Sequence, residues 1–279
     1  MKVAVIGAGT MGAGIAQAFA ANPNYTVLLC DIKPEWAEGG KAKIAKNLAR
    51  LVSKEKMTQP EMDALLGRIT TGLAKQAGEC DLVVEAALEK MDLKKELFSE
   101  LDSLCKPEAL FATNTSSLSV TELSAGLGRP VVGMHFFNPA PVMKLVEVVR
   151  GLTTPPELVD KIVEIAQAIG KTPVVVQDCA GFVVNRLLVP MVNEAVGIYA
   201  EGIASAEDID TAMKLGANHP MGPLALGDLI GLDVCLAIME VLYSEMGDSK
   251  YRPHPLLRKM VRGGKLGRKT GSGFFNYTA

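Results

Sequence analysis

The stretch KVAVIGAGTMG, residues 2–12, decides the fold. After Lys2 its first half is a continuous apolar run to Ile6, which is typical of a central strand covered on both faces. Its second half matches G-x-G-x-x-G, and a helical pattern over residues 11–21 follows at once. A strand, this glycine pattern and a helix in direct succession predict a dinucleotide-binding unit.

Each part of the glycine segment has a physical role in such a site. Gly7 allows the tight turn, Gly9 lets a pyrophosphate approach the backbone, and Gly12 lets the helix pack closely on the strand. The amides of Thr10 and Met11 open the helix, where the helix dipole favours phosphate groups. A glycine turn without a ligand is the alternative interpretation.

The second predicted strand ends in a carboxylate. Residues 26–30 are apolar apart from Thr26, and Asp31 follows them. Asp31 lies roughly 20 residues after Gly12, where a carboxylate binds the adenine ribose hydroxyls and repels the 2'-phosphate of NADP. The sequence therefore favours NAD. Lys33 is able to neutralise such a phosphate, so NADP is the less favoured alternative, and Asp31 is also explained as a turn residue.

The order of the remaining patterns indicates the architecture. Short apolar runs alternate with helical patterns up to Gly181, which predicts an α/β fold with a Rossmann-type, doubly wound, mostly parallel sheet. A polar stretch of helical spacing, about residues 35–66, predicts one inserted helix. Beyond Gly181 only helical patterns follow, over residues 185–201, 205–215 and 227–246. We expect a dinucleotide-binding domain of residues 1–182 and a smaller all-α domain of residues 183–279. The predicted strands are residues 2–6, 26–30, 81–85, 109–112, 131–134, 145–149 and 173–176.

Two helix starts are predicted from capping chemistry. In Thr154-Pro155-Pro156-Glu157, Thr154 is expected to cap, with Pro155 in the first helical position and Glu157 completing a capping box. That helix is expected to end near Gly170. Ser205 is expected to cap the helix that follows it.

Composition excludes several classes of partner. The chain has 279 residues, 48% of them hydrophobic and 22% charged, as in an ordinary globular protein. A net charge of -2 gives no reason to expect nucleic acid or an anionic membrane as a partner. The five cysteines have no C-x-x-C spacing, which argues against a zinc site or a disulfide framework. We expect a cytoplasmic protein with reduced thiols, no bound metal and no membrane span.

One of the three histidines occupies a distinctive position. His135 ends the apolar run 131–134, and the carboxyl end of a sheet strand faces the ligand crevice of an open α/β fold. Glu147 interrupts a second apolar run, where a carboxylate is costly unless it is paired. We expect Glu147 to pair with His135 and raise the basicity of the imidazole, as proton abstraction from an alcohol requires. A structural His-Glu pair is the alternative; His219 and His254 precede prolines and suggest surface or capping roles.

Several further segments, taken together, resemble those of a known family. They are Asn114-Thr115-Ser116-Ser117, His135-Phe136-Phe137-Asn138-Pro139, Gly181-Phe182-Val183-Val184-Asn185-Arg186, Asp208-Ile209-Asp210, Met221-Gly222-Pro223 and Gly267-Arg268-Lys269-Thr270-Gly271-Ser272-Gly273-Phe274. They resemble the signature segments of the 3-hydroxyacyl-CoA dehydrogenase family, in order along essentially the whole chain. The length is similar to that of stand-alone bacterial members with short-chain substrates.

This resemblance implies a reaction and its residues. The reaction is the reversible, NAD-dependent interconversion of a short-chain (S)-3-hydroxyacyl-CoA and the 3-oxoacyl-CoA. His135 would be the general acid/base, oriented by Glu147, while Ser116 and Asn185 would bind the substrate oxygen. From the residues alone, Ser116 is a helix-capping candidate and Asn185 a helix-start residue.

The resemblance also implies contacts with the cofactor. Glu89 and Lys94 match positions on its nicotinamide side, Asn114 matches a further cofactor contact, and Lys33 matches a position near the adenine ribose. A solvated helix start explains Glu89 and Lys94 equally well.

The insertion resembles the family's helical arm over the CoA site. Arg50 and Lys54, four residues apart on one helical face, are candidates to contact CoA phosphates. A solvated basic face explains the two residues equally.

The helical domain resembles the family's dimerisation domain, so a homodimer is expected. Its first helix has apolar residues at helical spacing, which would serve equally as the core of the domain. These residues are Leu187, Leu188, Met191, Ala195 and Ile198.

There are two rival functions, and the second belongs to a different class of protein. A dehydrogenase of the same two-domain plan can act on a free hydroxy acid or sugar acid, commonly with a lysine base in the helical domain. Here the pair of His135 and Glu147 and the arm favour a CoA ester. A catalytically idle relative is the second rival, and it has no need to retain Ser116, His135, Glu147 and Asn185 together.

Overall fold

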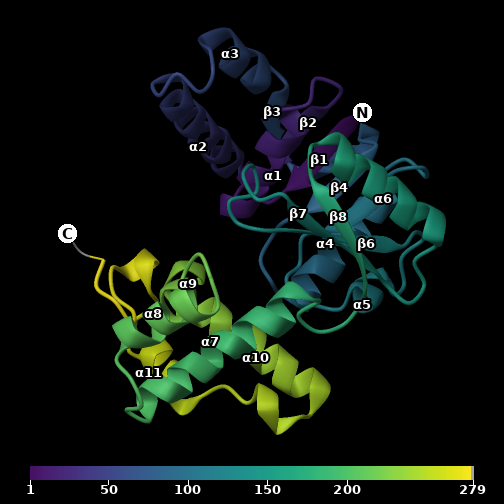
Figure 1. The fold of residues 1–279 in the computed structure, drawn as a ribbon. Coiled ribbons are helices and arrows are strands. Elements are labelled where there is room, and N and C mark those ends of the chain that lie inside the picture. Colours follow the sequence, from purple (N-terminus) through teal and green to yellow (C-terminus); the bar gives the residue numbers. More distant parts are fainter. Residues whose placement is uncertain (278–279) are drawn as a thin grey trace. The chain divides into compact units, whose positions relative to one another are not determined.

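The computed structural model describes residues 1–277, which form two compact units (Figure 1). The first, Met1–Asp178, is built of strands and helices, and the second, from Cys179 onwards, is helical. This alternation of α and β elements, followed by helices alone, confirms the predicted fold class. Among the described residues no helix is long and apolar enough to span a membrane.

The first unit contains an eight-stranded sheet in the order β3-β2-β1-β4-β5-β6-β7-β8. All neighbours pair in parallel except β6 and β7, which are antiparallel. The carboxyl ends of β1, β2, β4, β5 and β6 therefore meet at one edge, where α/β folds bind ligands. The strands are β1 Lys2–Ile6, β2 Thr26–Cys30, β3 Ile69–Gly72, β4 Leu82–Glu85, β5 Leu110–Thr113, β6 Val131–Phe136, β7 Leu145–Arg150 and β8 Thr172–Gln177.

Helices cover both faces of this sheet. Along β1, Val3 and Val5 join one apolar cluster, which includes residues of α1, α2 and α6. Ala4 and Ile6 point the other way and join a second cluster, with residues of α4 and α5. This alternation is what a doubly wound sheet requires. The helices are α1 Thr10–Ala20, α2 Pro34–Val52, α4 Met91–Leu104, α5 Val120–Ser124 and α6 Pro156–Ala168.

The predicted single inserted helix is wrong: the insertion forms α2 and then α3, Gln59–Gly67. A capping box starts α3, because Thr58 Oγ1 accepts a hydrogen bond from the Glu61 amide and the Glu61 carboxylate accepts one from the Thr58 amide. Strand β3 follows α3 and was not predicted. Its four residues include only one that is buried, Ile69, so no apolar run marks it.

The predicted start of α6 is also wrong. Pro155 is the N-cap and Pro156 the first helical residue, so Thr154 lies one position too early to cap. The Thr154 hydroxyl is buried and instead donates to the Val131 carbonyl, at 3.4 Å. The predicted end is confirmed, since Gly170 follows α6 with a φ of +74°.

The second unit consists of α7 Val184–Ala200, α8 Ala206–Gly216, α9 Pro223–Ile230, α10 Leu232–Met246 and α11 Pro255–Arg262. Ser205 caps α8 as predicted, accepting from the Asp208 amide. The helix predicted over residues 227–246 is instead two helices. Gly231 separates them with a φ of +105°, which a residue with a side chain rarely adopts.

Candidate active site

The glycine segment has the geometry that its pattern predicts. Gly7 has a φ of +103°, and a Cβ there would collide with the Ala86 carbonyl on the neighbouring β4 side. A Cβ on Gly12 would collide with the Gly7 carbonyl, so Gly12 permits the close approach of α1 to the strand. A Cβ on Gly9, by contrast, would meet no atom within 4 Å. The backbone at Gly9 is thus accessible to a ligand.

The start of α1 suits a phosphate group. Gly9 is its N-cap and has no side chain to accept hydrogen bonds from the first-turn amides. Such amides, together with the helix dipole, bind anions.

Asp31 lies beside this helix start. Its Oδ2 accepts from the Ala8 amide at 2.7 Å, and its Oδ1 accepts from the Ile32 amide at 2.8 Å. A pocket of about 290 Å³ adjoins it, lined by Ala8, Gly9, Asp31, Glu35, Trp36, Gly39 and Lys43. The ammonium of Lys33 lies 5.2 Å from the centre of the Trp36 ring. A glycine backbone that a pyrophosphate can approach and a carboxylate for the ribose hydroxyls are what the adenosine diphosphate part of NAD requires, so these residues fit NAD.

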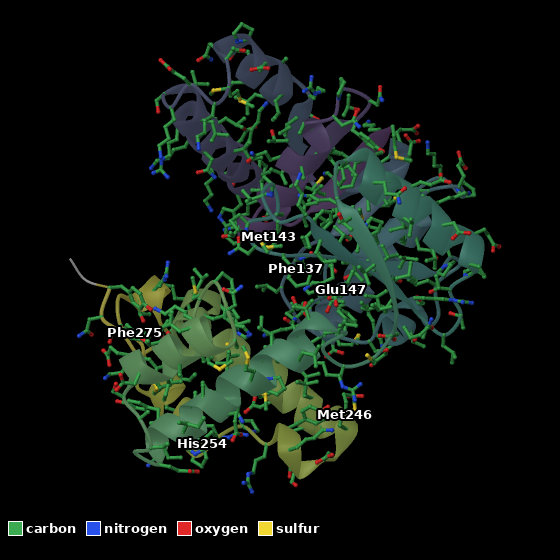
Figure 2. All side chains as sticks on the ribbon, viewed as in Figure 1. Phe137, Met143, Glu147, Met246, His254 and Phe275 are labelled. Atoms are coloured by element: carbon green, nitrogen blue, oxygen red, sulfur yellow. The ribbon has the colours of Figure 1, made fainter. Side chains whose placement is uncertain are left out.

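His135 and Glu147 form a buried pair at the same edge of the sheet (Glu147 is labelled in Figure 2). They are directly opposite in the antiparallel register of β6 and β7, so their side chains emerge on one face. His135 Nδ1 is 2.8 Å from Glu147 Oε2, as the sequence predicts for a buried carboxylate in need of a partner. A carboxylate oxygen accepts, so Nδ1 carries the proton and Nε2 is the basic nitrogen.

Asn114 ties the ends of two strands together beside this pair. It follows β5, and its side-chain oxygen accepts from the Phe136 amide on β6 at 2.8 Å. The ring of Phe137 packs on the His135 ring, with centroids 4.6 Å apart (Phe137 is labelled in Figure 2). Asn114 therefore links the ends of β5 and β6, and Phe137 packs against the imidazole.

Glu89 organises the turn that carries Ser116. Its Oε1 accepts from the Thr115 hydroxyl at 2.6 Å, from the Ser116 amide at 2.7 Å and from the Ser117 amide at 3.2 Å. Lys94 is almost fully buried in α4, with its ammonium 2.6 Å from Glu85 and 3.4 Å from Glu89. The sequence interpretation missed Glu85, although a carboxylate that ends an apolar strand is the signal that identified Asp31.

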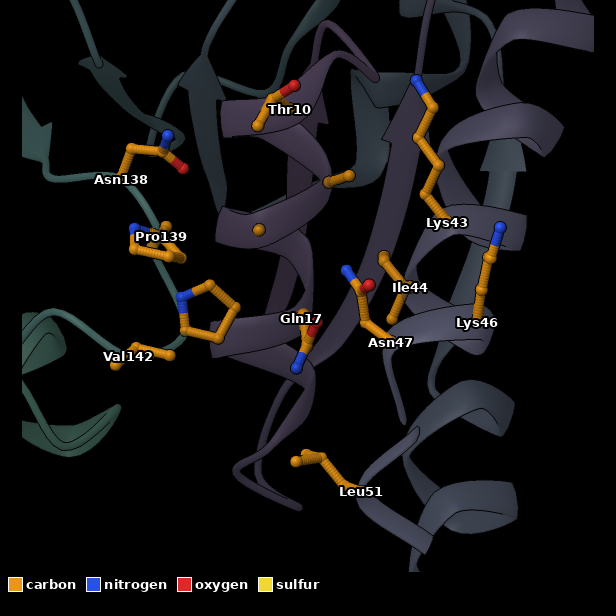
Figure 3. A pocket seen from close by; sticks show the side chains of 14 residues that line it. Thr10, Gln17, Lys43, Ile44, Lys46, Asn47, Leu51, Asn138, Pro139 and Val142 are labelled. Carbon is orange, nitrogen blue, oxygen red and sulfur yellow. The ribbon is translucent and has the colours of Figure 1, made fainter. Parts of the chain in front are cut away.

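A second pocket, of about 520 Å³, lies between the arm and the loop after β6 (Figure 3). Figure 3 shows Lys43 and Lys46 of α2 on one wall, Val142 on the opposite wall and Gln17 of α1 between them. Lys43 also lines the pocket beside Asp31. These two lysines are basic groups that sequence reasoning missed, because the polar arm offered many equivalent charges.

The expectation that Arg50 and Lys54 share one helical face is wrong. Arg50 lies in the last turn of α2, but the helix ends at Val52 and Lys54 follows the C-cap, Ser53. The arm residues that line the pocket are Lys43, Ile44, Lys46, Asn47 and Leu51.

The loop wall of this pocket is fixed from two sides. The Lys171 ammonium donates to the carbonyls of Ala140 and Met143, at 2.5 and 2.8 Å. On the other side Ala140 packs so closely on α1 that a Cβ at Gly14 would lie 3.1 Å from the Ala140 Cβ. Burial lowers the pKa of Lys171.

Asn185 lies in the first turn of α7, in the second unit. Other segments that carry the family resemblance contact each other in that unit. The Asp210 carboxylate accepts from the amides of Leu224 and Ala225, and a Cβ on Gly222 would collide with Asp210. His254 caps α11 by accepting from the Leu256 amide, which confirms its predicted capping role (Figure 2).

The combination of an NAD-type glycine segment with a histidine-carboxylate pair at the same sheet edge defines a nicotinamide-dependent dehydrogenase. Comparisons give the family. The family model for the 3-hydroxyacyl-CoA dehydrogenase NAD binding domain matches residues 2–179, and that for the C-terminal domain matches residues 181–277. The chain belongs to the 3-hydroxyacyl-CoA dehydrogenase family, and its cofactor is NAD.

Individual relatives agree along the full length. The chain is 54% identical to the 3-hydroxybutyryl-CoA dehydrogenase of Clostridioides difficile, over 99% of both chains. It is 42% identical to human mitochondrial hydroxyacyl-coenzyme A dehydrogenase, over 99% of this chain and 90% of that protein. The crystal structure of (S)-3-hydroxybutyryl-CoA dehydrogenase from Ralstonia eutropha matches with a TM-score of 0.94 and 47% identity, over 100% of this chain and 99% of that one.

Proposed function

We propose that the protein interconverts (S)-3-hydroxybutyryl-CoA and acetoacetyl-CoA with NAD as cofactor. The observation that carries this proposal is the buried pair of His135 and Glu147 at the edge that also bears the glycine segment. The short acyl chain and the S configuration of the hydroxyl carbon are taken from the names of relatives that are about half identical to this chain.

His135 is the proposed general acid/base. With Nδ1–H donated to Glu147, Nε2 takes the hydroxyl proton during oxidation and returns it to the carbonyl oxygen during reduction. The Glu147 carboxylate stabilises the imidazolium that forms. Bound NAD supplies the hydride acceptor at the carbon that bears the hydroxyl.

Ser116 and Asn185 are proposed to bind the substrate oxygen. Glu89 supports this role for Ser116, since it accepts hydrogen bonds from Thr115, Ser116 and Ser117 in the turn. The role of Asn185, on α7, rests on the family likeness.

The cofactor is proposed to lie along the edge of the sheet. Its pyrophosphate would contact Gly7, Gly9 and Gly12 with the amides of Thr10 and Met11, and its adenine ribose would contact Asp31, with Lys33 nearby. The family likeness further suggests that Asn114, Glu89 and Lys94 contact the nicotinamide end of the cofactor.

The CoA phosphates are proposed to bind along the arm. Lys43 and Lys46 in the larger pocket supply positive charge. Arg50, in the last turn of α2, and Lys54, after its C-cap, are further candidates. The loop wall of this pocket is held by the Lys171 hydrogen bond to Ala140 and by the close packing of Ala140 on Gly14. A wall held in this way favours a ligand of defined shape.

We further propose that residues 1–182 form the cofactor domain, that residues 183–279 form the substrate and dimerisation domain, and that the protein is a cytoplasmic homodimer. Exposed apolar side chains on the second unit, including Leu187, Tyr199 and Ile203, support self-association. Sedimentation equilibrium that yields a monomer at micromolar concentration would contradict the dimer.

The first experiment is NADH consumption with acetoacetyl-CoA, run beside free acetoacetate and beside NADPH. Rapid turnover with the thioester and NADH, and little with the free acid, is expected if the CoA moiety is bound. Equal turnover of the free acid would favour the rival that acts on free hydroxy acids. A folded protein that binds NADH but turns over neither compound would contradict the proposal.

A further inference from the structure

The loop that connects β6 to β7 is held by one buried lysine. Lys171 precedes β8 and is 7% exposed, and its ammonium donates to the carbonyls of Ala140 and Met143 in this loop. None of the ion pairs formed among residues 1–277 includes Lys171. A buried ammonium without a carboxylate partner is costly, so its place in the fold depends on these two loop carbonyls.

The loop has a turn of its own, which presents the carbonyls to the lysine. The Pro139 carbonyl accepts from the amides of Val142 and Met143, at 2.9 and 3.0 Å. Ala140, inside this turn, is 2% exposed. Without the Lys171 ammonium, the Ala140 carbonyl would lose its donor at a buried place, which costs free energy. The lysine therefore stabilises one shape of the turn.

The opposite side of the loop packs on α1. A Cβ at Gly14 would lie 3.1 Å from the Ala140 Cβ and 3.2 Å from the Pro141 Cδ, so a larger residue at this position would push the loop away. The loop is therefore held between Lys171 on one side and Gly14 on the other.

The remaining surface of the loop forms a wall of the larger pocket. Asn138, Pro139 and Val142 lie across this pocket from the arm (Figure 3). The described residues that line the pocket do not include Lys171. The lysine thus acts on the pocket through the loop.

From this geometry we infer that Lys171 is a positioning residue for the acyl-CoA substrate, because it holds the loop between β6 and β7 in the shape that the CoA part of the substrate contacts. The inference deepens the proposed function and rests on it for the identity of the ligand. In a loop without this lysine, binding of the CoA ester would also have to order the wall, and that ordering reduces affinity.

Substrate affinity should be affected more than the chemical step. His135 lies opposite Glu147 in the register of β6 and β7, and the next pair, Phe136 and Val146, separates them from the loop. The sheet therefore positions the imidazole. We expect loss of Lys171 to raise KM and to leave kcat nearly unchanged, since saturating substrate restores the order of the wall.

Three variants separate positioning from charge and from folding. Lys171→Met removes the donors and keeps a side chain of similar length. Lys144→Met is the matched control, because Lys144 ends the same loop, is exposed and lies close enough for its charge to repel that of Lys171. Gly14→Ala displaces the loop from the α1 side while the ammonium stays. This variant gains helix propensity, so it tests the inference even if Lys171→Met fails to fold.

Kinetics, binding and exchange are measured for wild type and the three variants. They are kcat and KM with acetoacetyl-CoA, the NADH Kd, the acetoacetyl-CoA Kd without cofactor, and amide hydrogen exchange of the peptide that contains residues 137–144. In Lys171→Met we expect KM and the acetoacetyl-CoA Kd to rise about tenfold, because the wall must be ordered on binding. The kcat should stay within about threefold of wild type, as loss of uniform binding predicts. The NADH Kd should rise by a smaller factor than KM, and exchange in the loop should become faster.

The other two variants should differ from each other. Gly14→Ala should raise KM in the same direction as Lys171→Met, and Lys144→Met should change none of these quantities. If Lys144→Met raises KM as much as Lys171→Met does, attraction of the anionic substrate explains the effect and the inference is overturned.

A kcat that falls in Lys171→Met while KM stays constant would also overturn the inference, and so would unchanged exchange in the loop. Where Lys171→Met does not fold, a wild-type KM in Gly14→Ala has the same consequence. The acetoacetyl-CoA Kd and the exchange require no turnover. They therefore decide the role of Lys171 even if wild type fails to reduce acetoacetyl-CoA, the result that contradicts the proposed function.

Discussion

At the scale of single residues, the contact between His135 and Glu147 follows from a simple constraint. A carboxylate that is 1% exposed within an apolar strand must be paired, and the register of β6 and β7 places His135 directly opposite Glu147. The sequence was sufficient to predict this contact. It did not reveal the antiparallel register that creates it.

Removal of the imidazole tests the catalytic proposal. His135→Ala should lower kcat by about 10²–10⁴-fold, the usual contribution of a general acid/base, and leave the NADH Kd close to that of wild type. Steady-state kinetics and calorimetry provide the two values. His219→Ala, in the second unit, is the control; an unaltered kcat in His135→Ala would exclude the role.

Cofactor selection is tested at Asp31. Asp31→Asn keeps an oxygen that can accept from the Ala8 amide but removes the negative charge. The NADPH/NADH ratio of Kd values should fall about tenfold, or about 1.4 kcal/mol, because the repulsion of the 2'-phosphate is removed. Asp63→Asn, on the exposed side of α3, should leave the ratio unchanged. If the ratio also stays constant in Asp31→Asn, the ribose contact lies elsewhere.

Residues at the edge of the site were harder to interpret from sequence than those within it. Asp31 and His135 each end an apolar strand, so topology alone places them. Lys94 gave no such signal, since a lysine early in a helix is usually solvated. Its burial in α4 depends on an ion pair with Glu85, the last residue of β4. Lys43 and Lys46 could not be distinguished from the many other charges of the arm.

At the scale of elements, one capping prediction succeeded where a local contact decides and another failed where a tertiary contact does. Ser205 caps α8 as expected because the amide it accepts from lies only three residues along the chain, whereas the Thr154 hydroxyl donates to the distant Val131 carbonyl. Strand β3 exists because its backbone pairs with β2, although its side chains are mostly polar. Such long-range pairing leaves no trace in a four-residue pattern.

The junction of α8 and α9 depends on one carboxylate. Asp210, in α8, accepts from the Leu224 and Ala225 amides in the first turn of α9, and it is 4% exposed. Asp210→Ala should lower the free energy of unfolding by about 2–3 kcal/mol, because two amides lose a charged acceptor. Urea unfolding measures this change. Asp208 is exposed, so Asp208→Ala should lower the free energy of unfolding by clearly less. Equal losses in the two variants would contradict the capping role of Asp210.

At the scale of the whole molecule, buried thiols link stability to alkaline pH. Burial raises the pKa of Cys30 and of Cys235 to about 12, and that of Cys80 to about 11, from a reference value of 9.0. Above pH 9 the unfolded chain releases these protons and the folded protein retains them. Their stabilisation is therefore complete below pH 9 and is lost as the pH rises towards the folded-state values.

We expect the free energy of unfolding to decrease above pH 9 by about 1.4 kcal/mol per pH unit for each such thiol. Cys235→Ala should be somewhat less stable at pH 7, because a small cavity remains. Its free energy of unfolding should nevertheless decrease less steeply with pH, since the contribution of one thiol is removed. Denaturant unfolding at several pH values gives both quantities. Identical slopes would show that Cys235 does not contribute to the decrease.

The sequence contains one tryptophan, and the fold places it on the pocket beside Asp31, half-exposed and with the Lys33 ammonium above its ring. The fluorescence emission of an indole overlaps the absorption band of a reduced nicotinamide. That emission also changes with the charge close to the indole ring. The fluorescence of this tryptophan is therefore expected to report whether the pocket beside Asp31 is occupied. Cofactor arrival can be followed in real time on the unlabelled chain, without any acyl substrate and before any chemistry occurs.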